Sequence, residues 1–130
     1  MTSMKPPGAI PNSQQDIYAF LMRGFNAAAP EQMEDQWDWL IAAHVAVQQQ
    51  YALHWRVHWE MLRFALELRD YRETMGQLLR LALVPLGHAV GRLPVGNTGR
   101  ANVNAFRPMA VSDRTRALLY AARESARELQ

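Results

Sequence analysis

The sequence predicts an all-α protein of about five helices, which we expect to stack as antiparallel hairpins. Three observations predict this class. Apolar residues recur at helical spacing in one segment after another, helix-capping residues and prolines separate these segments, and no segment shows the alternation of a strand. At 130 residues the chain has the length of one domain that can bury a hydrophobic core without disulfide bonds.

The chain opens with a segment that has no helical pattern. Residues 1–12 contain Pro, Gly and Ser without periodicity, so we expect a flexible N-terminal arm, followed by a single helical domain over 13–130. The first helix is expected over 13–29, where apolar residues recur every fourth position. It forms the first half of the first predicted hairpin.

The second helix is expected over 30–48. Pro30 suits the first helical position, because proline has a fixed φ and its missing N–H would have no helical partner there. Apolar residues then follow the spacing i, i+3, i+4, i+7, and the last position of this stripe is His44. The pattern therefore places a histidine where a core residue is expected.

The third helix, over 52–69, is expected to be the central one. Its apolar residues form two groups on different sides, and only one strip of Arg and Glu is charged. His54 and His58 lie between the two apolar groups, so we expect them to be buried. All four tryptophans stand at helical spacing and are expected to pack in the core or between helices: Trp37, Trp39, Trp55 and Trp59.

The fourth helix is expected to begin after Asp70, because Asp70 followed by Glu73 is a capping signature. The short turn predicts antiparallel packing on the third helix. Pro85 is expected to kink or end this helix, because its ring clashes with the preceding turn, and a short helix over 86–92 then follows. The stripe expected to face the core consists of Met75, Leu78, Leu79 and Ala82.

A long loop and one more helix complete the predicted fold. Residues 93–111 are rich in Gly, Asn and Pro, and Ser112 caps a last helix over 113–129. We expect the loop to lie across the helices, anchored by Val103, Phe106 and Met109. The succession of hairpins is tetratricopeptide-like only in the loose sense, because the signature of that repeat is absent.

Three of the four histidines, His44, His54 and His58, fall within fifteen residues of apolar sequence. His54 and His58 are four residues apart, so they share one helix face. If the chain reverses near Gln50, His44 lies level with the midpoint between them, and three imidazoles converge. His88 is expected to be an ordinary histidine near a helix end.

Three histidines without cysteine suit a zinc, copper, nickel or iron ion, with one position left for water or a carboxylate. The spacing lacks the glutamate of a zinc-protease motif, because Trp55 follows His54. The alternative is that all three are neutral core histidines, hydrogen-bonded to carbonyls, to the glutamines at 48–50 or to an acid such as Asp38. The sequence leaves both interpretations open.

Positive charge is concentrated in the second half of the chain. Residues 61–130 contain eleven arginines and six acids, and from Thr74 to Ser112 there are four arginines and no acid. This acid-free segment predicts a site for an anion or an acidic partner, formed by Arg92, Asn97, Thr98, Arg100 and Arg107. The alternative is a loop with a purely structural role.

The composition excludes several classes of protein. The absence of cysteine excludes disulfide bonds, thiolate metal sites and iron–sulfur clusters. A single lysine and the lack of a dense basic run argue against nucleic-acid binding, and no apolar stretch is long enough to span a bilayer. The N-terminus has no signal-peptide pattern, so we expect a cytoplasmic protein.

The segment GRLPVGNTGRANVNAFRPM at 91–109 carries a resemblance to a known family. Together with the histidine spacing and GQLLR at 76–80, it resembles small bacterial proteins catalogued as domain of unknown function 3703. The resemblance covers residues 27–112. It implies a short all-helical bacterial protein, and it supplies no activity, substrate or catalytic residue.

Two functions follow from these observations. The first is a non-catalytic helical protein that binds one transition-metal ion through His44, His54 and His58. The second is an interaction adaptor or homo-oligomer that uses the basic loop over 92–109 and the grooves between helices, with structural histidines. A small metal-dependent enzyme has less support, because the sequence contains no paired carboxylates, Ser/His/Asp order or nucleotide-binding motif.

Overall fold

The computed structural model describes residues 12–105 and 107–129, which form five helices and no strand. The helices are α1 (Asn12–Ala27), α2 (Met33–Val47), α3 (Tyr51–Glu67), α4 (Tyr71–Val90) and α5 (Asp113–Glu128). The all-α class predicted from the sequence is confirmed. The arm predicted over 1–12 lies outside the described residues, apart from Asn12, which begins α1.

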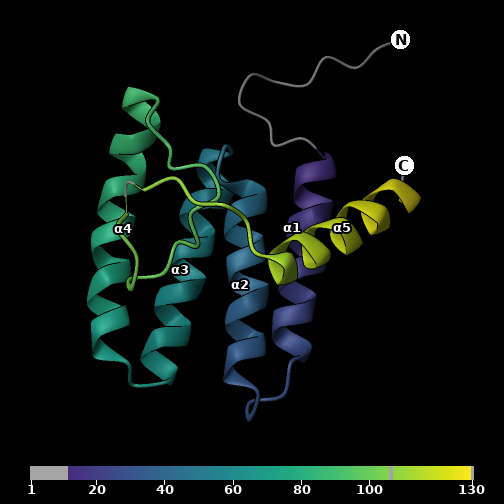
Figure 1. Ribbon diagram of the computed structural model, residues 1–130, viewed down its shortest axis with the longest axis horizontal. Coiled ribbons are helices and arrows are strands. Elements are labelled where there is room, and N and C mark those ends of the chain that lie inside the picture. The colour runs from purple at the N-terminus through teal and green to yellow at the C-terminus, as the bar shows by residue number, and fades with distance from the viewer. Residues whose placement is uncertain (1–11, 106, 130) are drawn as a thin grey trace.

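Four helices stand side by side in chain order, and the linker after α4 lies across them and leads to α5 (Figure 1). Figure 1 shows α1 to α4 as an up-and-down row, with the linker over 91–112 crossing in front before it reaches α5. The helices pack as the pairs α1–α2 and α3–α4, α2 also packs on α3, and α5 packs on α1 and α2. Within the part of the chain that the structure describes, no helix is long and apolar enough to cross a membrane.

The hydrophobic core lies among α1, α2, α3 and α5. One cluster of buried residues joins Leu21 of α1, Val57 of α3 and Leu119 of α5. A second surrounds Trp37 of α2, whose ring packs edge-on against Phe64 of α3 with 4.9 Å between the centroids. Burial of these apolar faces is what holds these four helices together.

The second helix begins three residues later than predicted. The N–H of Gln32 donates to the carbonyl of Ala29 at 2.9 Å, which closes a turn around Pro30, and α2 starts at Met33. Proline suits the second position of a β-turn as well as the first position of a helix, and here the turn forms. The predicted start at Pro30 is therefore wrong.

Of the two outcomes predicted for Pro85, an end of the helix is wrong, because α4 continues through this proline to Val90. A proline inside a helix lacks the N–H that would bond the carbonyl four residues earlier, which here belongs to Leu81. That carbonyl instead accepts a hydrogen bond from the indole N–H of Trp55 in α3, at 3.2 Å. The tryptophan thus supplies the donor that the proline lacks.

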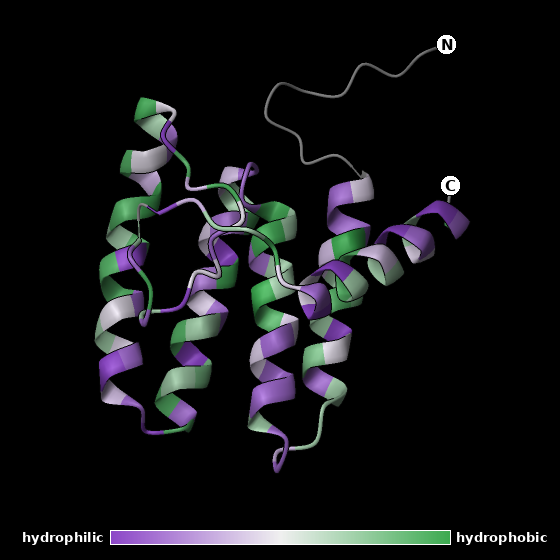
Figure 2. Ribbon diagram, in the orientation of Figure 1, coloured by the Kyte–Doolittle hydropathy of each residue, from purple (hydrophilic) through white to green (hydrophobic). Residues whose placement is uncertain are grey.

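The face of α4 that contacts the rest of the molecule is mostly polar. Its buried side chains are Glu73, Thr74, Gln77, Arg80 and Val84. The stripe predicted to face the core points to solvent instead, since Met75 is 66% exposed and Leu79 is 56% exposed. Figure 2 shows how apolar α4 is along much of its length. The prediction is wrong because backbone groups of the linker cover the inner face, and such groups need polar partners.

The tryptophans divide between core and surface. Trp37 is buried and Trp39 is half-buried against Phe20, as predicted. Trp55 connects α3 to α4 through its indole N–H, although it is 40% exposed. Trp59 is 45% exposed and stacks parallel to Trp55 on the outside of α3, so its predicted place in the packing is wrong.

The linker between α4 and α5 contains no helix in its described residues, so the short helix predicted over 86–92 is absent as a separate element. Of its predicted anchors, Val103 and Met109 are half-buried, and Phe106 lies outside the described residues. Gly96 has a φ of 77°, and a side chain there would meet the carbonyl oxygen of Met109. Glycine is required at this position by both conformation and space.

Candidate metal centre

His44 of α2 and His54 and His58 of α3 are buried side by side. The chain reverses at Gln50, whose side-chain oxygen accepts a hydrogen bond from the N–H of Leu53 at 3.3 Å and so caps α3. The ring centroid of His44 lies 4.9 Å from that of His54 and 4.7 Å from that of His58. One nitrogen from each ring lies within 4.8 Å of the other two. The three imidazoles therefore meet, as the sequence predicts for a reversal near Gln50.

Hydrogen bonds at the outer edge of two rings determine where their protons lie. Nδ1 of His44 is 2.8 Å from the carbonyl oxygen of Asn97, and Nδ1 of His58 is 2.8 Å from the amide oxygen of Gln77. Because both oxygens only accept, each Nδ1 carries the hydrogen, and Nε2 of the neutral ring keeps its lone pair. The orientation of the Gln77 amide follows from its nitrogen, which donates to the carbonyl of Gly99 at 2.9 Å.

His54 lies between His44 and His88. Its Nε2 is 3.1 Å from Nε2 of His44, and its Nδ1 is 2.9 Å from Nε2 of His88 in α4. In the metal-free protein His54 donates through Nε2 and accepts from His88 through Nδ1, because Nε2 of His44 has no hydrogen. His88, predicted to be an ordinary histidine near a helix end, thus belongs to the cluster. Only the packing of α4 on α3 brings it there, and no spacing in the sequence signals this.

Burial keeps the imidazoles neutral. Loss of solvent lowers the pKa of His54 to about 3 and the pKa of His58 to about 4, and it lowers the pKa of His44 well below its usual value. Neighbouring positive charge acts in the same direction, since Arg80 lowers the pKa of both His44 and His58. A neutral imidazole is the form that binds a metal ion, so burial prepares these rings as ligands.

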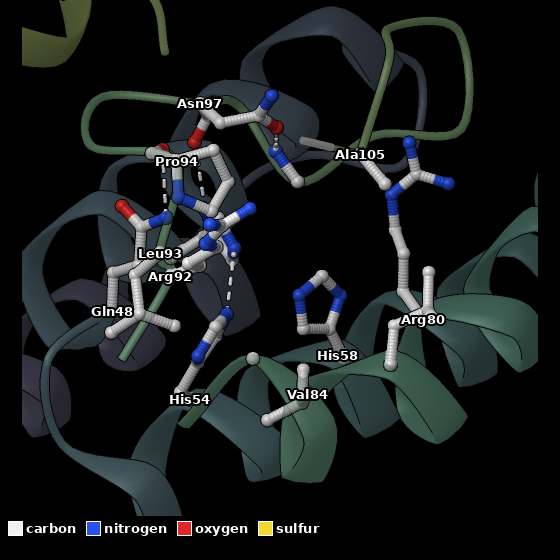
Figure 3. Close-up of a pocket in the computed structure, with 14 residues that line it drawn as sticks. Gln48, His54, His58, Arg80, Val84, Arg92, Leu93, Pro94, Asn97 and Ala105 are labelled. Atoms are coloured by element: carbon white, nitrogen blue, oxygen red, sulfur yellow. Dashed lines mark hydrogen bonds between the residues drawn. The ribbon is translucent and has the colours of Figure 1, made fainter. Parts of the chain in front are cut away.

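The linker closes the cluster from the side opposite α3. Figure 3 shows Pro94 and Asn97 of the linker across the cavity from His54 and His58. Gly99 has a φ of 83°, and a Cβ built on it would lie 2.8 Å from Cγ of His44. The linker backbone can therefore pass over the His44 ring only where the residue is glycine.

Residues predicted to form an anion or partner site take different positions in the linker. Asn97 is buried, and its amide nitrogen donates to the carbonyls of Asn104 and Arg107 at 2.9 Å and 2.8 Å. The hydroxyl of Thr98 accepts a hydrogen bond from the N–H of Arg100 at 3.3 Å. Both side chains thus hold the linker in shape.

The arginines of the same segment divide between one that pairs within the chain and two that are exposed. Nε of Arg100 bonds the carboxylate of Glu73 in α4 at 3.4 Å, and the N–H of Ala101 bonds the other oxygen of that carboxylate at 2.9 Å. The acid-free segment therefore binds an acid of its own chain. Arg92 and Arg107 are exposed, and their binding of an external anion or partner stays a prediction.

A cavity of about 40 Å³ adjoins the three imidazoles. Arg80 and Val84 of α4 line it on one side, and Leu93 and Pro94 of the linker line it on the other. Among the described residues that line it, none is acidic. The site therefore combines three nitrogen donors with a small, largely apolar space.

The arrangement can hold a metal ion. In a tetrahedral site with bonds of about 2.0 Å, neighbouring nitrogens lie about 3.3 Å apart. Nε2 of His44 and Nε2 of His54 are already 3.1 Å apart. The bonds from Nδ1 of His44 and His58 to fixed acceptors are of the kind that orients metal-binding histidines.

The fold and the site define a small all-helical protein whose buried histidines come together beneath a linker. The chain belongs to the family described as Protein of unknown function (DUF3703), whose model matches residues 12–119. This confirms the family resemblance carried by the sequence. No curated protein and no solved structure matches the chain.

Proposed function

We propose that the protein binds one transition-metal ion through His44, His54 and His58. The observation that carries the proposal is the convergence of three buried imidazoles, two of which have Nδ1 bonded to a fixed acceptor. Zinc, copper, nickel and iron all accept such ligands, and burial keeps the rings neutral, so no net loss of protons is needed. The hydrogen that His54 carries on Nε2 in the metal-free protein would move to Nδ1, where Nε2 of His88 can accept it.

A purely structural role explains the cluster less completely. A buried imidazole that only supports the core has hydrogen-bond partners for its polar atoms. Among the described residues only Nδ1 of His58 takes part in a hydrogen bond, and His58 lines the cavity, so its Nε2 has a lone pair open to a ligand there. Of the partners that a structural role predicts, only a carbonyl is found, that of Asn97 on His44, whereas Gln48 bonds the carbonyl of Pro94 and Asp38 pairs with Arg114. A metal ion in the cavity would use this lone pair of Nε2 in His58 together with the other two rings.

Metal uptake by protein purified without an affinity tag tests the proposal. After chelation and dialysis, titration calorimetry with Zn²⁺ and with Co²⁺ is expected to give one ion per chain for the wild type. The variant His54→Ala/His58→Ala is expected to lose this uptake, while Gln49→Ala, at an exposed position in the nearby turn, keeps it. Circular dichroism establishes that each variant remains helical. A wild type that takes up no ion overturns the proposal.

Gln77 provides a second test, because it connects the site to a buried acid. Its oxygen accepts from Nδ1 of His58, and its nitrogen lies 3.3 Å from the carboxylate of Glu73. Removing a partner of this kind lowers metal affinity by about 10- to 100-fold. We expect Gln77→Leu to weaken Zn²⁺ binding by that factor without changing the stoichiometry, and Gln77→Glu to retain more of the affinity because it keeps an acceptor. Equal affinity of Gln77→Leu and wild type contradicts this role.

We also propose that the chain associates with a second copy of itself, because one face of α4 is apolar and exposed. This α4 apolar face consists of Tyr71, Met75, Leu78, Leu79, Leu86 and Val90, each at least 47% exposed. At 100° per residue these side chains fall within about 120° of the helix circumference. Soluble single chains rarely expose a continuous apolar surface of this length.

The dimensions of this face fit a second copy. A helix of 20 residues is about 30 Å long, and the exposed Trp55 and Trp59 of α3 widen the surface to two helices, about 20 Å. Such a surface buries about 1,200 Å² in total between two copies, which is the lower bound for a stable interface. A twofold axis also brings Arg72, near the start of α4, to the end of the other α4, where positive charge is favourable.

Sedimentation equilibrium of the full chain tests this association. The wild type is expected to be a dimer and Leu78→Glu/Leu86→Glu a monomer of unchanged helicity. Tyr120→Glu is the matched control, because Tyr120 is 67% exposed but lies on α5, and it is expected to stay dimeric. A monomeric wild type, or a dimer that persists in the double variant, contradicts the proposal.

A further inference from the structure

We infer that the metal ion at this site takes a small anion from solution as its fourth ligand, an inference that rests on the proposed metal binding. Three imidazoles leave one position of a tetrahedral ion without a ligand. His44, His54 and His58 all line the same cavity, whose volume is about 40 Å³. This volume holds about three atoms of the size of a water oxygen.

The described residues offer no carboxylate for that position. None of the residues that line the cavity is acidic. The acid connected to the cluster is Glu73, whose carboxylate accepts hydrogen bonds from Gln77, from Arg100 and from the N–H of Ala101. Because both of its oxygens have partners, Glu73 is held away from the ion, and the fourth ligand has to come from outside the described chain.

Positive charge at the cavity favours an anion in this position. Arg80 lines the cavity and is only 6% exposed. Its guanidinium donates to the carbonyls of Gly76 and Val103, at 3.3 Å and 2.6 Å, and these bonds do not neutralise its charge. The nearby Glu73 is already paired with Arg100. A divalent ion held by neutral imidazoles would add further charge that no described group of the cavity compensates.

The apolar part of the lining favours a small anion over a large one. Leu83, Val84, Leu93 and Pro94 supply apolar walls, which offer no hydrogen bonds to a large hydrated ion. Hydroxide and linear ions such as azide have the charge and the size required. The small volume next to the imidazoles and the apolar walls therefore favour a small monoanion.

Azide titration of the Co²⁺-loaded protein tests the inference, because the visible spectrum of Co²⁺ reports its ligands directly. We expect azide to change the spectrum of the wild type in a saturable way. Arg80→Met is expected to weaken azide binding by about tenfold through loss of one buried charge, and Arg80→Lys to stay within about threefold of the wild type. Arg123→Met, which removes an exposed arginine from α5, is the control and keeps wild-type azide affinity.

The outcomes separate the two proposals. If the wild type binds no Co²⁺, the proposed metal binding fails. If it binds one Co²⁺ and azide leaves the spectrum unchanged, metal binding stands and the fourth-ligand inference is overturned. Azide affinity that is equal in Arg80→Met and wild type overturns the role assigned to the charge of Arg80. Because Arg80→Lys retains the charge, a loss of azide binding in both Arg80 variants also contradicts that role.

Discussion

Acid is expected to destabilise the metal-free protein through its buried histidines. Burial lowers the pKa of His54 to about 3 and that of His58 to about 4, whereas an unfolded chain has a histidine pKa of about 6.5. A group whose pKa is lower in the folded state stabilises the fold fully above the unfolded value. That stability is lost as the pH falls from about 6.5 towards the folded value, because protons bind the unfolded chain preferentially.

The magnitude follows from the same values. At pH 5 the two folded imidazoles are still neutral, while each imidazole of the unfolded chain is almost fully protonated. Each histidine then favours unfolding by about 2 kcal/mol relative to pH 8, so the pair contributes about 4 kcal/mol. This is a large fraction of the 5–15 kcal/mol that is typical of a whole domain. His44, whose pKa is also lowered by burial, adds to the loss.

Urea unfolding followed by circular dichroism, with a chelator present, measures this difference. The free energy of unfolding is expected to be lower at pH 5 than at pH 8 by about 4 kcal/mol or more. His54→Gln/His58→Gln should show a pH dependence smaller by about that amount, because its unfolded state has two fewer groups to protonate. A wild type whose stability changes by less than about 1 kcal/mol over this range would refute the assignment of these rings as buried and neutral.

Two further predictions concern the backbone around the site. Gly99→Ala should lower Zn²⁺ affinity by about tenfold or more in calorimetry, because its Cβ would displace the His44 ring. Gly91→Ala is the control, since Gly91 also has a positive φ but a Cβ there would meet nothing within 4 Å. It should destabilise the fold by about 1 kcal/mol and leave Zn²⁺ affinity unchanged. Equal metal affinity in the two variants would contradict this. Trp55→Phe should destabilise the wild type by about 1 kcal/mol and the Pro85→Ala background by less, because alanine restores the N–H that the indole replaces. Additive effects in this double-mutant cycle would show that the indole does not compensate for the proline.

Local signals in the sequence predict most of the helix boundaries. The side chain of Asp70 accepts from the N–H of Glu73 at 3.1 Å, and the side chain of Ser112 accepts from the N–H of Thr115 at 3.2 Å, so both predicted caps form. These signals are reliable because a cap depends only on residues within one helical turn. The two prolines are exceptions. Pro30 satisfies a turn and a helix start equally well, and neighbouring hydrogen bonds decide between them, whereas Pro85 is accommodated inside α4 by a contact with α3.

The candidate site could be predicted only in part, for a related reason. The convergence of His44, His54 and His58 depends on one short turn, and the sequence predicts where that turn lies. The place of His88 in the cluster depends on how α4 packs on α3. The orientation of Gln77 depends on where the linker, more than twenty residues later in the chain, returns to α4. Contacts of that kind are set by the tertiary structure, and helical periodicity carries no information about them.

The orientation of α4, whose apolar face points to solvent and not to the core, connects these wrong predictions to the proposed function. Apolar periodicity correctly identifies an apolar face on this helix, but the opposite face is the one that the linker covers. The linker presents the carbonyls of Gly99 and Val103, and Gln77 and Arg80 of α4 bond them. The same Gln77 orients His58, so the polar network that holds the linker also orients the histidine cluster proposed to bind a metal. A bound metal ion should therefore stabilise the packing of the linker on α4 as well as the histidine cluster, and slower hydrogen exchange at the N–H groups of Gly99 and Ala101 is the expected sign of this coupling.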